Sequence, residues 1–384
     1  MPARRPPPPS HRTPSRAQQK HAEKTARAAA RDPKTRPKKA QTPKVIFVGA
    51  PEVEELLLHE LGPRAFSLTQ GVVALPEVPK DLPDPIFARQ VLVSPKHITA
   101  STVDELAAGI IAALGDASPR TAFAFAPEMP RQQSAPRPPH ALAEYAARLE
   151  DTVRQKLSGR REKGKLGAAT AHVVQALVTA PGEAYVVVDA VSAGSDPLSA
   201  WPGVFGGGRA IDEAARDAPS SAHRKLSEAI AWLAVDVGAA DVVVDLGAAP
   251  GGWTRVMREY GAKVIAVDRA ALDDVIAKDP GVTHLKKDAA SVDLAALVPT
   301  IVICDVIWGP EHAVAVARRA LQEKTLRAAV ITLKLKSDVA WDVLADARRL
   351  VRDLPADVSG RVKHLGANKR EVTLLLRRGV ARRA

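Results

Sequence analysis

The feature that most constrains the fold of this 384-residue chain is an apolar strand that runs into a glycine-rich turn. Residues 242–244 are all valine, and residues 245–254 read Asp-Leu-Gly-Ala-Ala-Pro-Gly-Gly-Trp-Thr before a helical pattern continues through Tyr260. A continuous apolar run is typical of a strand that is buried on both faces of a parallel sheet. In open α/β sheets, ligands bind beyond the carboxyl ends of the strands, where glycines let a ligand approach the backbone. The turn therefore predicts an α/β domain with a ligand site at that edge.

The same alternation of strand and helix continues over residues 219–384. Strands are expected at 264–267, 283–285, 301–305, 328–335, 362–365 and 372–376, with helices at 221–236, 310–326 and 340–353. Strands that alternate with helices over ~165 residues favour an open, mainly parallel sheet with helices on both faces. We therefore predict a Rossmann-like α/β domain over residues 219–384.

Two acidic residues follow the next two strands and indicate what the turn binds. The turn has neither the G-x-G-x-x-G spacing of dinucleotide sites nor the lysine of a phosphate-binding loop. Asp268 follows the second strand, where a carboxylate can accept hydrogen bonds from ribose hydroxyls. Asp288 follows the third strand, where an acid can meet an adenine amino group. A glycine-rich turn alone would fit a plain tight connection equally well, but the two acids favour a nucleoside pocket.

At these residues the sequence resembles a known family. Residues 245–254 resemble motif I of the FtsJ-type ribose 2′-O-methyltransferases, and residues 220–226 match the S-x-A-x-x-K-L start of that family's preceding helix. The resemblance implies that S-adenosylmethionine is the cofactor and that it is bound by Gly247, Ala249, Pro250, Gly251, Gly252, Trp253, Asp268, Asp288 and Asp305. It also implies a catalytic tetrad of Lys225, Asp305, Lys334 and Glu371, all present here in the family's order.

The chemistry of methyl transfer explains the residue types of this tetrad. A ribose hydroxyl is a poor nucleophile near neutral pH, so the enzyme must align the displacement and remove or share the hydroxyl proton. Lys334 is the predicted general base. Since a free lysine has a pKa of roughly 10.4, this role needs desolvation or a neighbouring cation such as Lys225 to lower the pKa. The alternative is that Lys334 stays protonated and only steers the hydroxyl and stabilises the alkoxide.

The segment after the fourth strand bears on which atom is methylated. Enzymes that methylate exocyclic amines usually carry a D/N-P-P-Y/F-type motif there, whereas residues 305–310 of this chain read Asp-Val-Ile-Trp-Gly-Pro. This difference disfavours methylation of a base nitrogen. Trp308 could stack on a nucleobase or belong to the packing, and Cys304 is expected to be a buried strand residue.

The residues before this domain divide into three parts by composition. Residues 1–44 hold thirteen Lys and Arg against two acids, which is +11 of the chain's net charge of +12, and their lack of apolar residues predicts a disordered, Pro-rich polycation. Residues 45–192 predict a smaller α+β domain, with strands at 172–179 and 184–191 expected to pair as a hairpin. Residues 193–218 are rich in Gly, Pro, Ser and Asp and predict a linker.

The front region narrows the resemblance. Residues 86–90 and 172–182, with Trp201-Pro202 in the predicted linker, resemble the bacterial large-subunit rRNA cytidine 2′-O-methyltransferases, whose front domain is of the THUMP type. This resemblance implies that the substrate is RNA, a cytidine of large-subunit rRNA, and that the front domain grips it. The predicted RNA contact is a basic cluster, unless it is simply the solvated end of a helix. Its members are Arg154, Lys156, Arg160, Arg161, Lys163 and Lys165.

Composition disfavours several other classes. No run approaches ~18 consecutive apolar residues, so we expect no membrane span, and no apolar segment follows the basic N-terminus as in a secretory signal. The single cysteine excludes an internal disulfide and a cysteine-based zinc cluster. We expect no metal, a cytoplasmic location and a monomer. Two alternatives stay open: a 2′-O-methyltransferase of tRNA or another RNA, and a noncatalytic RNA-binding or ribosome-assembly protein on a methyltransferase scaffold.

Overall fold

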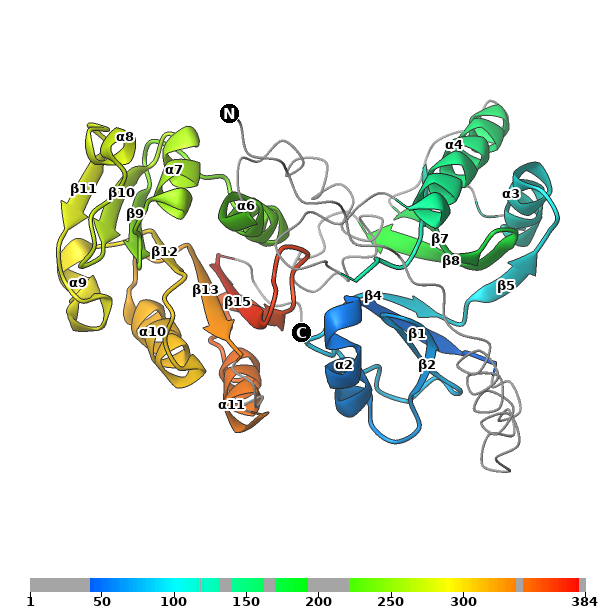
Figure 1. Ribbon diagram of the computed structural model, residues 1–384, viewed down its shortest axis with the longest axis horizontal. Helices are drawn as coiled ribbons and strands as arrows, with labels where there is room; N and C mark the ends of the chain where they lie inside the picture. The colour runs from blue at the N-terminus through cyan, green and yellow to red at the C-terminus, as the bar shows by residue number, and fades with distance from the viewer. Residues whose placement is uncertain are drawn as a thin grey trace, which may run out of the picture. The chain divides into compact units, whose positions relative to one another are not determined.

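The computed structural model describes residues 42–115, 117, 119, 121–130, 140–161, 170–192, 221–335 and 341–379 (Figure 1). Residues 43–384 form one compact unit, to which everything below refers. The predicted linker at 193–218 and nearly all of the predicted tail at 1–44 lie outside the described residues. None of the described helices is long and apolar enough to cross a membrane.

Seven strands of the C-terminal half form one sheet in the order β11-β10-β9-β12-β13-β15-β14 (Figure 1). They are β9 (Val242–Leu246), β10 (Lys263–Val267), β11 (Val282–Leu285), β12 (Ile301–Cys304), β13 (Ala328–Lys334), β14 (Val358–Lys363) and β15 (Glu371–Arg378). Neighbouring strands from β11 to β13 run parallel, whereas β15 is antiparallel to both β13 and β14. The short connection at 364–370 explains the antiparallel edge, because a parallel pair needs a longer crossover. The predicted mainly parallel sheet is confirmed.

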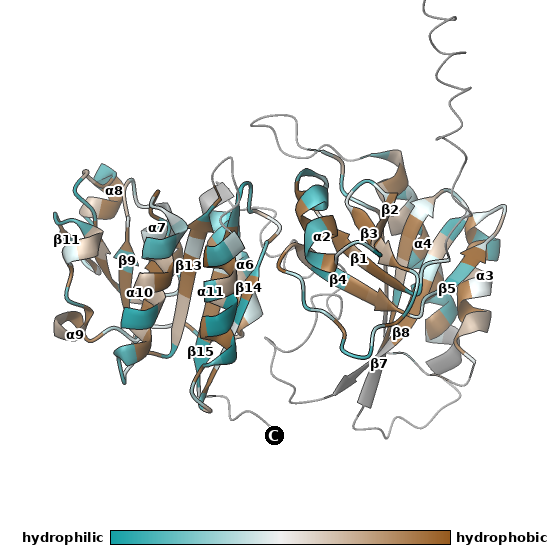
Figure 2. Cartoon of the chain, turned by 90° about the horizontal axis from the view of Figure 1, so that it is seen from below, coloured by the Kyte–Doolittle hydropathy of each residue, from teal (hydrophilic) through white to brown (hydrophobic). Residues whose placement is uncertain are grey.

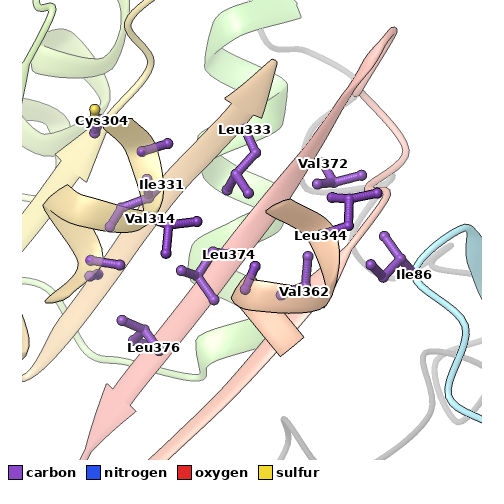
Figure 3. Packing of buried hydrophobic residues seen from close by; sticks show 14 of the residues in the cluster. Ile86, Cys304, Val314, Ile331, Leu333, Leu344, Val362, Val372, Leu374 and Leu376 are labelled. Carbon is purple, nitrogen blue, oxygen red and sulfur yellow. The ribbon is translucent and has the colours of Figure 1, made fainter. Parts of the chain in front are cut away.

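Helices cover both faces of this sheet, as predicted. On one face, α6 (Ser221–Leu233) and α7 (Gly252–Glu259) pack with β9, β10, β12 and β13. On the other face, α10 (Pro310–Gln322) and α11 (Trp341–Arg352) share a core that holds Val314, Leu344 and Leu374 (Figure 3). Because both faces are covered, the central strands are buried at nearly every residue, and their sequences are continuous apolar runs. Short helices α8 (Asp274–Ala277), η4 (Ala289–Ser291) and α9 (Leu294–Leu297) connect the remaining strands.

The front region contains two four-stranded sheets. The first has the order β2-β3-β1-β4 and consists of β1 (Val45–Gly49), β2 (Phe66–Thr69), β3 (Val72–Leu75) and β4 (Ala88–Val93). The second has the order β5-β8-β7-β6 and consists of β5 (Lys96–Thr99), β6 (Thr121–Phe125), β7 (Thr170–Ala180) and β8 (Glu183–Ser192). The helices of this region are η2 (Pro51–Val53), α2 (Glu54–Leu61), α3 (Val103–Ala113) and α4 (Ala141–Arg161). In Figure 2 the strands of the first sheet are predominantly hydrophobic, whereas the helices also carry polar residues.

The predicted hairpin of the front region is confirmed, since β7 and β8 pair antiparallel along almost their whole length. Strands β2 and β5 were not predicted from the sequence. Each has only four residues, and neither contains a fully buried one, so no apolar pattern marks it. Their place in a sheet depends on pairing with β3 and β8 rather than on local sequence.

Candidate active site

Glycines shape the turn that follows β9. Gly247 has a φ of 81°, and a Cβ there would lie 2.5 Å from Cγ2 of Val306. Gly251 has a φ of 120°, and a Cβ there would lie 3.0 Å from Ile276. Both positions therefore need glycine for backbone conformation and for space. The turn delivers the chain into α7, which begins at Gly252 and presents its first backbone N–H groups at the carboxyl edge of the sheet.

Asp268 ties this turn to the next strand. Its Oδ2 accepts a hydrogen bond from the N–H of Ala249 at 3.1 Å, and its Oδ1 accepts one from the N–H of Ala270 at 2.8 Å. Asp288 lies beyond β11, accepts from the N–H of Ala290 at 2.9 Å, and has Arg269 3.8 Å away. The two predicted nucleoside-binding acids thus follow adjacent parallel strands, β10 and β11, and lie at the same edge as the turn.

Trp253 is placed differently from the other predicted cofactor residues. Its side chain is buried and packs in the core beneath α6 and α7. The ring lies 5.9 Å from Nζ of Lys225, which is within cation–π range. Trp253 therefore connects the turn to the helix that carries the first residue of the predicted tetrad.

Asp245 belongs to the turn motif, but no role was predicted for it from the sequence. Its carboxylate is buried near the end of β9 and accepts a hydrogen bond from Oγ1 of Thr254 at 2.6 Å. Burial raises the pKa of Asp245 to about 7, although the bond from Thr254 opposes the shift, and the charges of Asp305 and Asp268 raise it further. The signal for Asp245 was present in the sequence, as an acid at the end of an otherwise apolar strand.

The structure brings all four residues of the predicted tetrad together. Lys225 comes from α6, Asp305 directly follows β12, Lys334 ends β13, and Glu371 begins β15, where it is paired in register with Lys334. Their neighbours in sequence point the other way: Cys304, Leu333 and Val372 lie in the core shared with α10 and α11 (Figure 3). Because side chains alternate along a strand, Lys334 and Glu371 face the side on which α6 lies.

Each lysine of the tetrad touches both acids. Nζ of Lys225 lies 3.0 Å from Oδ2 of Asp305 and 2.6 Å from Oε1 of Glu371. Nζ of Lys334 lies 2.5 Å from Oδ1 of Asp305 and 2.6 Å from Oε2 of Glu371. The four groups form a closed ring of alternating charge. The side chain of Lys334 is 22% exposed and that of Lys225 is 8% exposed, so Lys334 is the more accessible amine.

The ring of charges determines the resting protonation of Lys334. Burial disfavours the charged amine, but Asp305 and Glu371 outweigh burial and raise the pKa of Lys334 above its ordinary value. Burial also disfavours the charge of Asp305, but Lys225 and Lys334 outweigh it and lower the pKa of that carboxyl. Lys334 therefore rests as an ammonium. In this resting state Lys334 can act as a base only after it has lost that proton.

The segment between β12 and α10 forms one wall beside the tetrad. Val306 packs against Gly247, and Trp308 is partly buried against the core with its ring 6.1 Å from that of His312. Ile307 lies between them and is 90% exposed. Cys304 is buried at the end of β12, as predicted, and burial raises the pKa of its thiol to about 12. Packing thus engages Trp308, while the apolar side chain that reaches solvent here is Ile307.

The predicted basic cluster is described only in part. Arg154 donates from Nε to the carbonyl of Ala122 at 2.9 Å and pairs with Glu150 at 3.0 Å. Lys156 lies 3.9 Å from Asp104. Arg160 and Arg161 belong to α4, but the structure does not describe their side chains. Lys163 and Lys165 lie outside the described residues.

The fold and the site define the class of protein. Residues 219–347 match the model of the FtsJ-like methyltransferase family, in agreement with the resemblance found in the sequence. The matched segment contains the turn and three of the four tetrad residues, and Glu371 lies beyond it on the strand paired with Lys334.

Curated relatives make the similarity more particular. The chain is 34% identical over 172 residues to the ribosomal RNA large subunit methyltransferase M of Alkalilimnicola ehrlichii, covering 43% of this chain and 48% of that protein. It is 34% identical over 193 residues to the protein of the same name from Halorhodospira halophila, covering 50% and 55%. A third, from Thauera aminoaromatica, is 32% identical over 170 residues, covering 42% and 46%. The chain thus spans about half the length of the curated relatives that it matches.

Proposed function

We propose that this protein transfers a methyl group from S-adenosylmethionine to a ribose 2′-hydroxyl of RNA, and that its substrate is a cytidine of large-subunit rRNA. The observation that carries the proposal is the ring formed by Lys225, Asp305, Lys334 and Glu371 beside the glycine turn. The similarity to relatives named as large-subunit rRNA methyltransferases supports the choice of RNA.

The described residues fit the proposed methyl donor. Gly247 and Gly251 keep side chains away from the turn, and a nucleoside placed there would meet Asp268 and Asp288 beyond the next two strands. Gly247, Ala249, Pro250, Gly251, Gly252, Trp253, Asp268, Asp288 and Asp305 remain the proposed binding residues. The donor supplies a methyl group that is already activated on a sulfonium, so the protein has to provide alignment and proton management.

The tetrad supplies that proton management. We propose that Lys334 accepts the proton of the 2′-hydroxyl, for which it must first release its own proton to the solvent that reaches its partly exposed side chain. The pKa of a lysine falls when water is excluded and when a cation is brought near. An RNA strand that covers Lys334 and a sulfonium at the neighbouring turn would each act in that direction. Asp305 and Glu371 hold the amine of Lys334 in position throughout, and Lys225 balances their charge.

We further propose a division of labour along the chain. Residues 219–384 carry catalysis, residues 45–192 form the RNA-binding domain, and residues 193–218 link them. The proposed RNA contacts in the front domain are Arg154, Lys156, Arg160, Arg161, Lys163 and Lys165. The side chain of Arg154 is 43% exposed, so its outer edge can reach a phosphate while Nε stays bonded to β6. We expect the protein to act as a monomer in the cytoplasm.

Mapping of 2′-O-methyl groups tests the function. RNA from a strain that lacks the gene should lose one ribose methylation in large-subunit rRNA, and the wild-type gene should restore it. The Lys334→Ala variant should bind S-adenosylmethionine normally in calorimetry but transfer methyl groups about 10²- to 10⁴-fold more slowly, because a positioned proton acceptor contributes that much. A lost site in tRNA would redirect the proposal. An unchanged methylation map, or full activity of Lys334→Ala, would refute it.

The basic tail offers a second test of the division of labour. Because residues 1–44 carry +11 of the +12 net charge, their deletion should weaken RNA binding and flatten its salt dependence. The methylated nucleotide should stay the same, since contacts of lysine and arginine with phosphates carry no sequence information. Binding titrations at several salt concentrations, together with methylation mapping, measure both effects. A changed target site would show that the tail takes part in recognition.

A further inference from the structure

The connection at 364–370 leads into Glu371 and is held from the side of α6. Glu228 of α6 accepts hydrogen bonds from the N–H of Gly366 at 2.8 Å and from the N–H of Ala367 at 3.2 Å. Glu228 is one turn beyond Lys225 on the same helix. The connection therefore couples the helix that carries one tetrad lysine to the strand that carries Glu371.

The last residues of the connection are fixed against the tetrad strands. Asn368 is buried and donates from Nδ2 to the carbonyl of Glu371 at 3.1 Å. The carbonyl of Arg370 accepts a hydrogen bond from the N–H of Leu335 at 2.8 Å, directly after Lys334. A shift of the connection would therefore move the backbone at Glu371 and beside Lys334.

The first residues of the connection are held by the front region, through Arg89 of β4. Arg89 donates from Nε to the carbonyl of His364 at 3.2 Å and from Nη2 to the carbonyl of Leu365 at 3.0 Å. Its Nη1 pairs with Glu128 at 2.8 Å, which orients the guanidinium. The N–H of His364 donates to the carbonyl of Ile86 at 2.8 Å. The planar fork of Arg89 thus satisfies two consecutive carbonyls at the start of the connection.

Arg89 also orients the ring of His364. Nη2 of Arg89 lies 3.1 Å from Nδ1 of His364, and Nε2 of the same ring lies 3.0 Å from the carbonyl of Lys369. Since a guanidinium can only donate, Nδ1 accepts and Nε2 carries the proton that bonds to Lys369. The ring of His364, at the start of the connection, therefore reaches Lys369, which lies two residues before Glu371. Arg89 selects the tautomer that makes this contact.

A second set of contacts anchors the segment before Arg89. Asp84 accepts hydrogen bonds from Arg361 at 2.9 and 3.0 Å and from Nζ of Lys363 at 2.5 Å. Glu60 accepts from the N–H groups of Ile86 and Phe87, each at 3.0 Å. The 84–89 segment is therefore fixed on β14 as well as on the connection.

We infer that Arg89 is a positioning residue for catalysis: through His364 and residues 364–370, the front region sets the place of Glu371 and hence of Lys334. The inference rests on the proposed methyl transfer, and it gives residues 84–89 a role beyond RNA binding. An error of about 1 Å in the placement of reacting groups can lower a rate by about 10²-fold. The front region would then act on kcat and not only on the affinity for RNA.

Arg89→Ala in the full-length chain tests this inference, with Arg64→Ala as the matched control. Arg64 is also a front-region arginine with a carboxylate partner, Glu77, but that ion pair is 75% exposed on both sides. We expect Arg89→Ala to lower kcat about 10- to 100-fold with KM for RNA and the affinity for S-adenosylmethionine within about twofold. Arg64→Ala should behave as wild type. Arg89→Lys should recover part of kcat, since one amine can donate to one of the two carbonyls.

Hydrogen exchange gives a readout that does not depend on activity. The amides of Gly366 and Ala367 should exchange at least tenfold faster in Arg89→Ala than in Arg64→Ala. If Arg89→Ala does not fold, the same exchange rates are measured in Arg89→Lys. Wild-type kcat together with wild-type exchange at these amides would overturn the inference, as would a loss confined to KM. A wild-type chain that methylates no RNA would instead contradict the proposed function, and the exchange rates would still decide whether Arg89 positions the connection.

Discussion

Lys334 and Lys363 each end a strand of the same sheet, yet their surroundings shift their pKa values in opposite directions. Lys334 is 22% exposed and touches two carboxylates, and the pKa of its amine is raised. Lys363 is 1% exposed and touches one carboxylate, Asp84, and the carbonyl of Pro85. Burial, with the nearby charge of Arg361 in support, outweighs Asp84 and lowers the pKa of Lys363 to about 8. Burial and the number of neighbouring acids together thus set the pKa of each amine.

The opposite pKa shifts of Lys334 and Lys363 suit the places of these two residues in the fold. The tetrad balances two lysines against two acids, so it keeps a charged amine ready beside a solvent-facing site. Around Lys363, by contrast, cations are in excess, because Arg361 and Lys363 share the single carboxylate of Asp84. These three residues lie at the contact between the front region and β14. The same residue type therefore serves proposed proton transfer in one place and anchoring in the other.

Removal of one acid from the tetrad should lower the pKa of Lys334, as the pKa of Lys363 is lowered in the native protein. In Glu371→Gln, Lys334 keeps only Asp305, so its pKa should fall, and the rise of kcat with pH, which follows deprotonation of this base, should move to lower pH. We also expect kcat to fall about 10²- to 10³-fold, because the amide cannot hold both amines. Steady-state methyl transfer measured from pH 6 to 10 checks this. An unmoved pH profile would show that Glu371 does not control the protonation of Lys334.

Removal of the acid at the other cluster should reduce the stability of the fold. Asp84→Ala leaves Lys363 buried without a carboxylate, which should reduce the free energy of unfolding by about 3 kcal/mol. The double variant Asp84→Ala/Lys363→Met should recover part of that loss, because the buried ammonium is gone while the buried guanidinium of Arg361 still lacks Asp84. Urea unfolding of the single and double variants gives the comparison. A double variant no more stable than Asp84→Ala would contradict an unpaired-charge effect.

The lowered pKa of Lys363 predicts an unusual pH dependence. Between about pH 8 and the unfolded value of roughly 10.4, the unfolded chain binds more protons at this residue than the folded chain does. The free energy of unfolding should therefore rise with pH in this window, by up to about 1 kcal/mol per pH unit, relative to Lys363→Met. The exposed Lys324 provides the control, since Lys324→Met should follow wild type. Parallel curves for wild type and Lys363→Met would refute the assignment.

Asp245 provides the acidic counterpart of Lys363. Because its pKa is raised to about 7, its contribution to stability is complete below the unfolded value of roughly 3.9 and is lost as pH rises through 7. Asp245→Asn should therefore be more stable than wild type at pH 8, by up to about 4 kcal/mol, and similar to it near pH 4. Thermal unfolding at the two pH values measures the difference. A constant difference would mean that Asp245 does not titrate in this range.

Much of the site could be predicted because its signals are local. The β9 strand, its glycine turn and the start of α7 are contiguous in sequence, so spacing alone indicated a ligand site. The tetrad was found through resemblance: Lys225 lies within α6, and the other three members lie at the ends of strands whose apolar pattern is clear. The short strands β2 and β5 carry no such pattern and were missed.

Contacts across the chain could not be predicted in the same way. Arg89 and His364 are 275 residues apart, and Asp84 and Lys363 are 279 apart. Each is a common surface residue type, and no periodicity connects one to the other. The contact of Arg89 with the connection before Glu371 and the lowered pKa values of Asp84 and Lys363 all follow from packing between distant segments.

By itself, the sequence determined the strand–helix alternation, the glycines of the turn and the set of charged residues available for chemistry, because these depend on local backbone and burial preferences. Only the tertiary structure decided which charges face each other. It placed two acids around Lys334 and one around Lys363, and it joined the front region to the connection before Glu371. The energy of a charge depends on distance and burial, and folding sets both for residues far apart in the chain.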